Sequence, residues 1–257
     1  MLKILKYSFF DLSRSYWNII YFLFFLVTTL GLVQLSGDNS RSLVSMMNIV
    51  IVLVPLISTL LGVMYFYNSR DFVELLLSQP IKRSSVFIGQ YLGLVLSLSM
   101  SFTLGLVLGL IISGMGISSG FGMLLLSGNL LTMIFTGLAF LISISTDNRI
   151  KGFGIAILTW LFLAVIYDGI FLLALVFLKD YPLETFTLSA IMFNPIDLSR
   201  ILVILDLDIS ALMGYSGAVY SRFFGATTGI LISILTLVIW ALAPVSLFIY
   251  SAGKKDF

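Results

Sequence analysis

The sequence predicts an all-α integral membrane protein with six transmembrane helices and an N-terminal interfacial helix, in a single transmembrane domain over residues 1–257. The 257-residue chain is 60% hydrophobic, and only 10% of its residues are charged. Its mean hydropathy is +1.13. Soluble domains are about 45–50% apolar and about 25% charged. A chain this apolar needs lipid over most of its surface.

The first predicted element is the interfacial helix, residues 1–16, which begins MLKILKYSFF. Apolar residues recur there every three or four positions, while Lys3, Lys6 and Arg14 fall largely on another face. This pattern is typical of a helix that lies on a membrane. The charges are spread out and no small-residue cleavage site follows an apolar core, so a cleaved signal peptide is not expected.

Six apolar runs follow, each long enough to cross a bilayer core of about 30 Å, which takes about 20 helical residues. Helices are expected because they satisfy their own backbone hydrogen bonds in lipid. The predicted spans are 17–35, 43–66, 85–112, 121–146, 152–178 and 227–251.

The predicted outer connections differ in length. Those near 36–42 and 113–120 are short, whereas 179–226 is far longer than a connector needs to be. We expect this long loop to be a docking surface or a lid, with a solvated insertion as the alternative. Its apolar piece ILVIL, residues 201–205, is too short to span and is expected to rest against the outer leaflet or the spans.

The Lys and Arg residues of the connections predict the orientation. Six spans place both termini on one side, and that side carries ten of these residues against four on the other. The ten are Lys3, Lys6, Arg14, Arg70, Lys82, Arg83, Arg149, Lys151, Lys254 and Lys255, and the four are Arg41, Lys179, Arg200 and Arg222. The positive-inside rule therefore predicts that both termini are cytoplasmic.

The stretch YNSRDFVELLLSQPIKRSS concentrates charge between the second and third predicted spans. It predicts a short amphipathic cytoplasmic helix over about 69–80, capped by Asn68 or Ser69 and ended by Pro80. A cap for the next span is expected from Ser84 or Ser85. One face of the short helix is expected to hold Phe72, Leu75, Leu76 and Gln79.

Two interpretations of this helix stay open. It is either a coupling helix seated in a groove of a cytoplasmic partner, or a solvated loop whose basic residues anchor a span at the lipid headgroups. The candidate coupling residues are Arg70, Asp71, Phe72, Glu74, Leu75, Gln79, Lys82 and Arg83, and the second cytoplasmic loop adds Asp147, Arg149 and Lys151.

Asp168, in FLAVIYDGIFLLAL, is the only acid well inside a predicted span. A carboxylate in lipid costs about 2.5–3.5 kcal/mol on insertion scales, which makes it a functional candidate. No basic residue lies in any predicted span to pair with it. We therefore favour a structural or gating contact over ion conduction.

Three glycine pairs at four-residue spacing let helix backbones approach closely. They are Gly89 with Gly93, Gly105 with Gly109, and Gly225 with Gly229. Packing within the chain is favoured over a dimer seam.

The chain has no cysteine and no histidine, which removes the commonest general base and the commonest metal ligands. Its ten methionines form no ladder of thioethers, so neither a bound metal nor a copper path is expected. No phosphate-binding G-x-x-x-x-G-K-[ST] motif occurs, and the net charge of +2 does not indicate nucleic acid. An intramembrane enzyme is the least favoured class, because few groups could activate a nucleophile.

The order of these elements resembles the ABC-2 type permeases, and ELLLSQPIKRSSVFIGQYLG matches the family's stretch that leads into span three. IYDGIFLLALVF, FNPIDLSRILVI and ALMGYSG are similar to NosY-type permeases, whose transporters help mature nitrous oxide reductase. The resemblance covers essentially the whole chain, and its most specific piece is Asn194, Pro195, Asp197 and Arg200. The chain departs at Phe72-Val73-Glu74, where family members often carry an acid followed by glycine.

The resemblance implies an ABC-2, or type V exporter-like, fold and a homodimer in the bacterial inner membrane. This non-catalytic subunit would bind no cofactor, and two copies of a cytoplasmic ABC ATPase (NosF-like) would use ATP and Mg²⁺. A periplasmic β-helix protein (NosD-like) would dock at Asn194, Pro195, Asp197 and Arg200, and motion passed through the spans would alter how it holds copper or a sulfur species. The alternative is an ordinary ABC-2 exporter of a lipid, drug or small metabolite.

Overall fold

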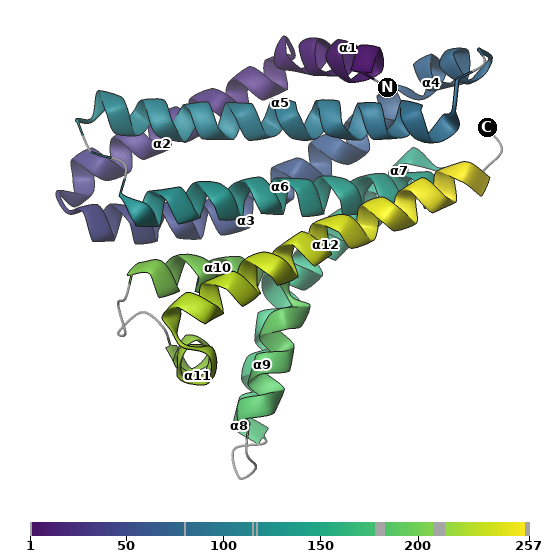
Figure 1. Ribbon diagram of the computed structural model, residues 1–257. Helices are drawn as coiled ribbons and strands as arrows, with labels where there is room; N and C mark the ends of the chain where they lie inside the picture. The colour runs from purple at the N-terminus through teal and green to yellow at the C-terminus, as the bar shows by residue number, and fades with distance from the viewer. Residues whose placement is uncertain are drawn as a thin grey trace.

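The computed structural model describes residues 2–79, 81–114, 116, 118–177, 183–207 and 214–254, which form helices and connecting turns without a strand (Figure 1). The predicted all-helical class is confirmed, and six helices of this part are long and apolar enough to cross a membrane. Pro80, Lys179 and Lys255 lie outside the described residues. The six are α2 (Tyr16–Ser36), α3 (Asn39–Asn68), α5 (Arg83–Ile112), α6 (Ser119–Ser145), the run of α7 (Arg149–Leu161), η1 (Phe162–Ile166) and α8 (Tyr167–Phe177), and α12 (Ala226–Lys254).

Helices α1 (Leu2–Ser13) and α2 lie one after the other along α5 and run in its direction (Figure 1). Glycines of α5 allow this close approach. A Cβ at Gly93 would lie 2.6 Å from the Cβ of Ser8, and one at Gly105 would lie 2.7 Å from the carbonyl oxygen of Phe22. These glycines therefore serve packing within the chain. The position of α1 relative to the lipid headgroups stays a prediction.

The centre of the bundle is the pair α3 and α6, which makes the most extensive helix contact. Aromatic side chains fill the space around it: the Phe140 ring meets Phe66 edge-on at 5.5 Å and Phe248 at 5.4 Å. The Tyr91 hydroxyl donates a 3.0 Å hydrogen bond to the carbonyl oxygen of Met133. Span five, by contrast, has only 6% of its apolar window buried. Lipid or a second chain must cover it.

The segment that the sequence predicted as a long outer loop is helical in its described part. It forms α9 (Glu184–Phe193), α10 (Pro195–Leu207) and α11 (Gly214–Phe224). Helices α9 and α10 meet at an angle of 109°, and Pro195 opens α10 at the first helical position, where its missing N–H costs nothing. The ILVIL piece is buried in α10, which packs on α12, α6 and α3.

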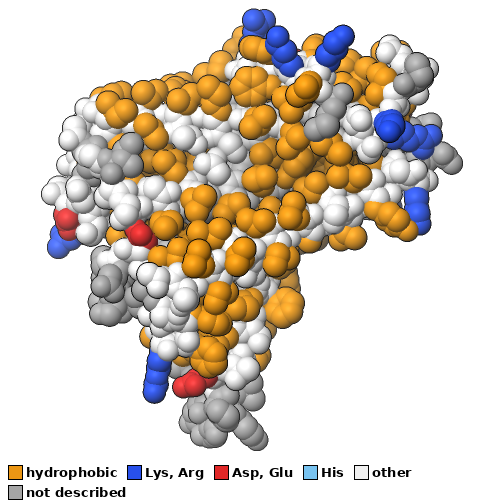
Figure 2. All heavy atoms as spheres, in the orientation of Figure 1, with side chains coloured by type: hydrophobic (Ala, Val, Ile, Leu, Met, Phe, Trp, Pro, Cys, Tyr) orange, Lys and Arg blue, Asp and Glu red, His pale blue; other side chains and the backbone are white. Residues whose placement is uncertain are grey.

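Figure 1 places the short helix α4 (Arg70–Leu77), the α6–α7 turn, and the ends of α1 and α12 at one end of the bundle, on the right of the view. We call this the α4 end. Most of the Lys and Arg side chains visible in Figure 2 lie at the top and right of the molecule, around this end. Helices α8 and α9 lie side by side below the main bundle (Figure 1), where the Phe171 and Phe186 rings stack at 6.3 Å.

Candidate functional site

Residues that the sequence assigned to two separate sites form one polar cluster in the structure. Arg200 of α10 places its Nη1 3.4 Å from Oδ2 of Asp168 on span five and donates a 2.9 Å hydrogen bond to Oδ1 of Asp197. As expected, no basic residue of the predicted spans pairs with Asp168, but Arg200, from the predicted outer loop, does. The partner comes from the helical elbow between spans five and six, because α10 folds back against the bundle.

Asn194, at the 109° elbow between α9 and α10, connects this cluster to an irregular turn of span five. Its Nδ2 donates to the carbonyl oxygen of Leu163 at 2.9 Å and to Oδ2 of Asp197 at 2.9 Å. Its Oδ1 accepts from the backbone N–H of Ile196 at 3.1 Å. Leu163 belongs to the π-helical turn η1, and such turns are frequent at functional sites.

One more hydrogen bond connects span five to the elbow: the Tyr167 hydroxyl donates to the carbonyl oxygen of Ala190 at 2.7 Å. A hollow of about 190 Å³ lies beside the cluster and is lined by Tyr167, Asp168, Asp197 and Arg200, among others. Two carboxylates facing one guanidinium leave one negative charge in excess when all are ionised. The arrangement holds span five and the elbow together, which agrees with a structural or gating role for Asp168.

The residues that the resemblance assigned to partner docking differ in accessibility. Asn194 and Pro195 are buried, so a partner would not reach them in this conformation. The Arg200 side chain is 35% exposed and that of Asp197 is 14% exposed. Contact with a partner at this cluster would fall mainly on Arg200.

Helix α11 packs on α9, α10 and α12, beside the elbow. Tyr220 is fully buried, and its hydroxyl lies 3.0 Å from the hydroxyl of Ser233 on α12. Burial raises the pKa of Tyr220, and the hydrogen bond with Ser233 acts in the opposite direction. The phenol therefore stays neutral and fastens α11 to the last span.

At the α4 end, apolar side chains hold the short charged helix against the bundle, and Leu76 and Leu77 pack on its core. Val73 is buried in the core, and the Phe72 ring stacks on Tyr7 of α1 with centroids 5.1 Å apart. Leu75 is 68% exposed and Gln79 is exposed. The predicted common face of Phe72, Leu75, Leu76 and Gln79 is therefore split: Phe72 turns inward, whereas Leu75 and Gln79 turn outward.

The caps of this region also differ from the prediction. Ser69 is the N-cap residue of α4, but its hydroxyl donates to the carbonyl oxygen of Phe66 at 3.2 Å and caps nothing. Helix α5 begins already at Arg83 with Lys82 as its N-cap residue, ahead of the serines expected to cap it. Arg70 and Glu74 form an exposed ion pair at 3.3 Å, which contributes little to stability.

The α6–α7 turn, which the sequence predicted as the second cytoplasmic loop, lies at the same end and is tied to the α3–α4 junction. The hydroxyl of Tyr67, three residues before the start of α4, donates to the carbonyl oxygen of Thr146 at 2.9 Å. Asn148 caps α7 by accepting from the N–H of Ile150 at 2.9 Å. A Cβ at Gly152 would collide with the Tyr67 ring. The predicted residues Asp147, Arg149 and Lys151 are exposed around this contact.

The sequence did not predict the contact among Tyr67, Thr146 and Gly152. A tyrosine at the end of a span is common at membrane interfaces, so only its place as the first residue of the charged stretch could have drawn attention to it. Among the described residues, no group of three acidic, His or Cys side chains has the arrangement of a metal site. No family model matches the chain, and no curated protein matches it either.

Proposed function

We propose that this chain is the permease subunit of an ABC transporter of the NosY type. It would couple ATP hydrolysis in the cytoplasm to a conformational change at a periplasmic partner, for delivery of copper or a sulfur species during nitrous oxide reductase maturation. It would act as a homodimer in the bacterial inner membrane with both termini cytoplasmic. Two NosF-like ATPases would bind ATP and Mg²⁺, and a NosD-like β-helix protein would dock outside.

The observation that carries the proposal is the division of α4 into side chains that hold it to the bundle and side chains that it exposes. Val73 and Phe72 hold this helix to the bundle, while Asp71, Glu74 and Leu75 are exposed at its surface. An exposed leucine beside two exposed acids is unusual for a plain headgroup anchor, which would present Lys or Arg. An amphipathic helix laid into a groove is a common recognition mode.

The contacts of span five support a mechanical role. Tyr67 connects the α4 junction to Thr146 at the start of the second loop, and span five begins directly after that loop. The same span carries the π-helical turn that Asn194 holds and the Asp168 that Arg200 holds. A push on α4 therefore has a continuous chain of packed groups to the outer elbow.

The chemistry of the chain also favours transmission of motion over passage of metal. It has no Cys and no His, which are the side chains that would hand copper along a path. The two carboxylates beside the 190 Å³ hollow are a feature that fits the alternative, an exporter with a polar substrate path.

Affinity purification of this chain from native membranes in mild detergent, followed by mass spectrometry, tests the proposal. We expect an ABC ATPase and a periplasmic β-helix protein to be recovered with it. Recovery of an ATPase alone would replace the proposal by the plain exporter. Recovery of neither protein would exclude both the proposed function and the plain exporter.

A further inference from the structure

The polar cluster between span five and α10 has a charge imbalance that a single proton removes. Two carboxylates share one guanidinium: Nη1 of Arg200 lies 2.9 Å from Oδ1 of Asp197 and 3.4 Å from Oδ2 of Asp168. Carboxylates that share one site do not both ionise at their ordinary pKa, because each negative charge repels the other. The protonation state of this pair therefore depends on its surroundings.

Asp197 is the less accessible of the two carboxylates. Its side chain is 14% exposed, against 32% for Asp168, and its helix α10 is not one of the six spans. Burial, and after it the charge of Asp168, raises the pKa of Asp197 to about 7, while Arg200 acts in the opposite direction. Both carboxylates border the hollow of about 190 Å³, which leaves the pair open to proton exchange.

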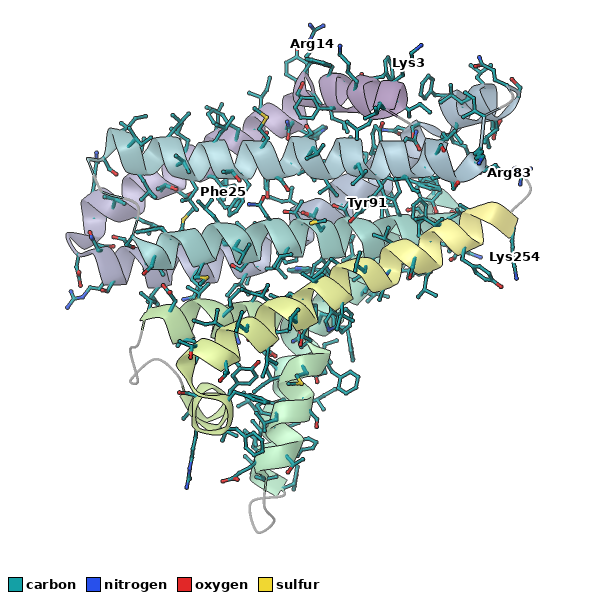
Figure 3. All side chains as sticks on the ribbon, viewed as in Figure 1. Lys3, Arg14, Phe25, Arg83, Tyr91 and Lys254 are labelled. Carbon is teal, nitrogen blue, oxygen red and sulfur yellow. The ribbon has the colours of Figure 1, made fainter. Side chains whose placement is uncertain are left out.

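The other charged residues of the helices packed on α10 do not border this hollow. They are Arg41 of α3, Glu184 of α9, Arg222 of α11 and Lys254 of α12, whereas α6 carries none. In Figure 3, Lys254 lies at the α4 end, away from α10. Tyr167 is the remaining titratable group on the lining, and its hydroxyl already donates to a backbone carbonyl. Among the described residues, the charge of the cluster is therefore set by Asp168, Asp197 and Arg200.

We propose that one proton, held between Asp168 and Asp197, stabilises the contact between the elbow and span five, and that its release loosens this contact. With the proton bound, the remaining carboxylate balances Arg200 and the cluster is neutral. Without it, the two carboxylates repel each other, and Arg200 parts from Asp168, the longer of its two contacts. Tyr167 and Asn194 still hold span five to the elbow through uncharged hydrogen bonds, so the elbow loosens at Asp168 without coming away.

Release of the proton lowers the stability of the chain as pH rises. The folded chain holds the proton up to a pH of about 7, whereas an ordinary aspartate carboxyl loses it near 3.8. Between these values the folded state binds more protons than the unfolded state, so stability falls as pH rises toward 7 and levels off above it. The effect belongs to this chain and needs no ATPase or periplasmic protein, so its failure and the failure of the proposed function are distinguishable.

The test is reversible unfolding of the full chain in mixed detergent at about pH 5.5 and at about pH 8, on either side of the pKa of Asp197. We expect the folding equilibrium constant to be roughly tenfold larger at the lower pH. Asp197→Asn should abolish this difference, and Asp168→Asn should shrink it and move it to lower pH. Glu184→Gln is the matched control, because it removes an exposed acid of the neighbouring α9 that does not border the hollow, and it should keep the full difference.

Each variant is its own reference, because the result is a ratio between two pH values and a uniform loss of stability does not change it. Spin labels on α8 and α10 give a second readout: their distance distribution should broaden at the higher pH in the unaltered chain and stay narrow in Asp168→Asn. An equal pH effect in Asp197→Asn and the unaltered chain would overturn the proposal, as would identical label distances at both pH values. So would a loss of stability at constant pH when N-methylglucamine replaces sodium ions, because a metal cation and not a proton would then balance the cluster.

Discussion

Asn194 donates a 2.9 Å hydrogen bond to the carbonyl oxygen of Leu163, inside the π-helical turn of span five. A π-turn widens the helix and releases a carbonyl from its regular partner. The buried amide at the elbow of α9 and α10 satisfies that carbonyl. The irregular turn and the elbow therefore depend on each other, although 31 residues separate them.

Replacing Asn194 by leucine should destabilise the chain by about 1–3 kcal/mol, because it leaves the Leu163 carbonyl and the Ile196 N–H without their buried partner. Reversible unfolding in mixed detergent, followed by circular dichroism, measures this. Ser189→Ala is the control, since that exposed hydroxyl only bonds Thr185 of its own helix. Equal stability of the two variants would show that the Asn194 bonds do not hold the elbow.

Arg200→Leu should destabilise by about 1–3 kcal/mol, less than a fully buried pair would lose because the cluster is partly exposed. It leaves Asp168 and Asp197 together without a cation. Asp168→Asn alone should cost less, since Arg200 keeps Asp197. Adding Asp168→Asn to Arg200→Leu should restore part of the lost stability, because it removes the repulsion between the two carboxylates, and the same unfolding assay detects this non-additivity. Simple addition of the two losses would argue against a shared cluster.

Much of the fold was accessible from the sequence, because the six spans are long apolar runs bounded by turn residues and charges. The polar cluster was not. Asp168 and Arg200 stand 32 positions apart, and only the 109° elbow at Asn194 brings α10 back to span five. The periodicity of a single helix carries no information on such a fold-back.

The orientation of α4 shows the same limit at close range. Its charges predicted an amphipathic helix, and Arg70–Leu77 is helical. Which apolar residues turn inward depends on α1, whose Tyr7 takes the Phe72 ring and leaves Leu75 to the outside. A helical-wheel projection of α4 alone cannot show where α1 lies.

Exposed residues of α4 should matter for a partner and not for folding. Asp71→Ala with Glu74→Ala, and separately Leu75→Ala, should leave stability within about 0.5 kcal/mol. If α4 docks the proposed ATPase, these variants should weaken co-purification of that ATPase and its stimulation. Phe72→Ala, by contrast, should lower the stability of the chain, because it removes the stacking on Tyr7. Normal binding of an ATPase to the triple variant would favour the headgroup anchor. The triple variant combines Asp71→Ala, Glu74→Ala and Leu75→Ala.

The packing of α2 on α5 predicts a contrast between two glycines. Gly105→Ala should cost about 1–3 kcal/mol, because its Cβ would press on the Phe22 backbone, which cannot move aside easily. Gly31→Ala, on α2, has nothing within 4 Å of the new Cβ and should leave stability unchanged or slightly higher. Unfolding of the two variants under one set of conditions measures the difference. Similar losses would mean that helix conformation and not close packing sets the effect.

Tyr67→Phe tests the connection between the α3–α4 junction and the α6–α7 turn. It removes the hydroxyl that bonds the carbonyl oxygen of Thr146 while keeping the ring, so the loss of stability should be only about 0.5–1.5 kcal/mol. If the chain transmits motion, the variant should still bind the ATPase but respond less to it. The response is read as ATPase stimulation and as distance changes between spin labels on α4 and α10.

Tyr250→Phe is the control, since Tyr250 is exposed and its ring lies 4.3 Å from the Lys254 ammonium, a contact that phenylalanine keeps. Normal stimulation in Tyr67→Phe would exclude this hydroxyl from the path and leave direct contact between α3, α5 and α6 as the route.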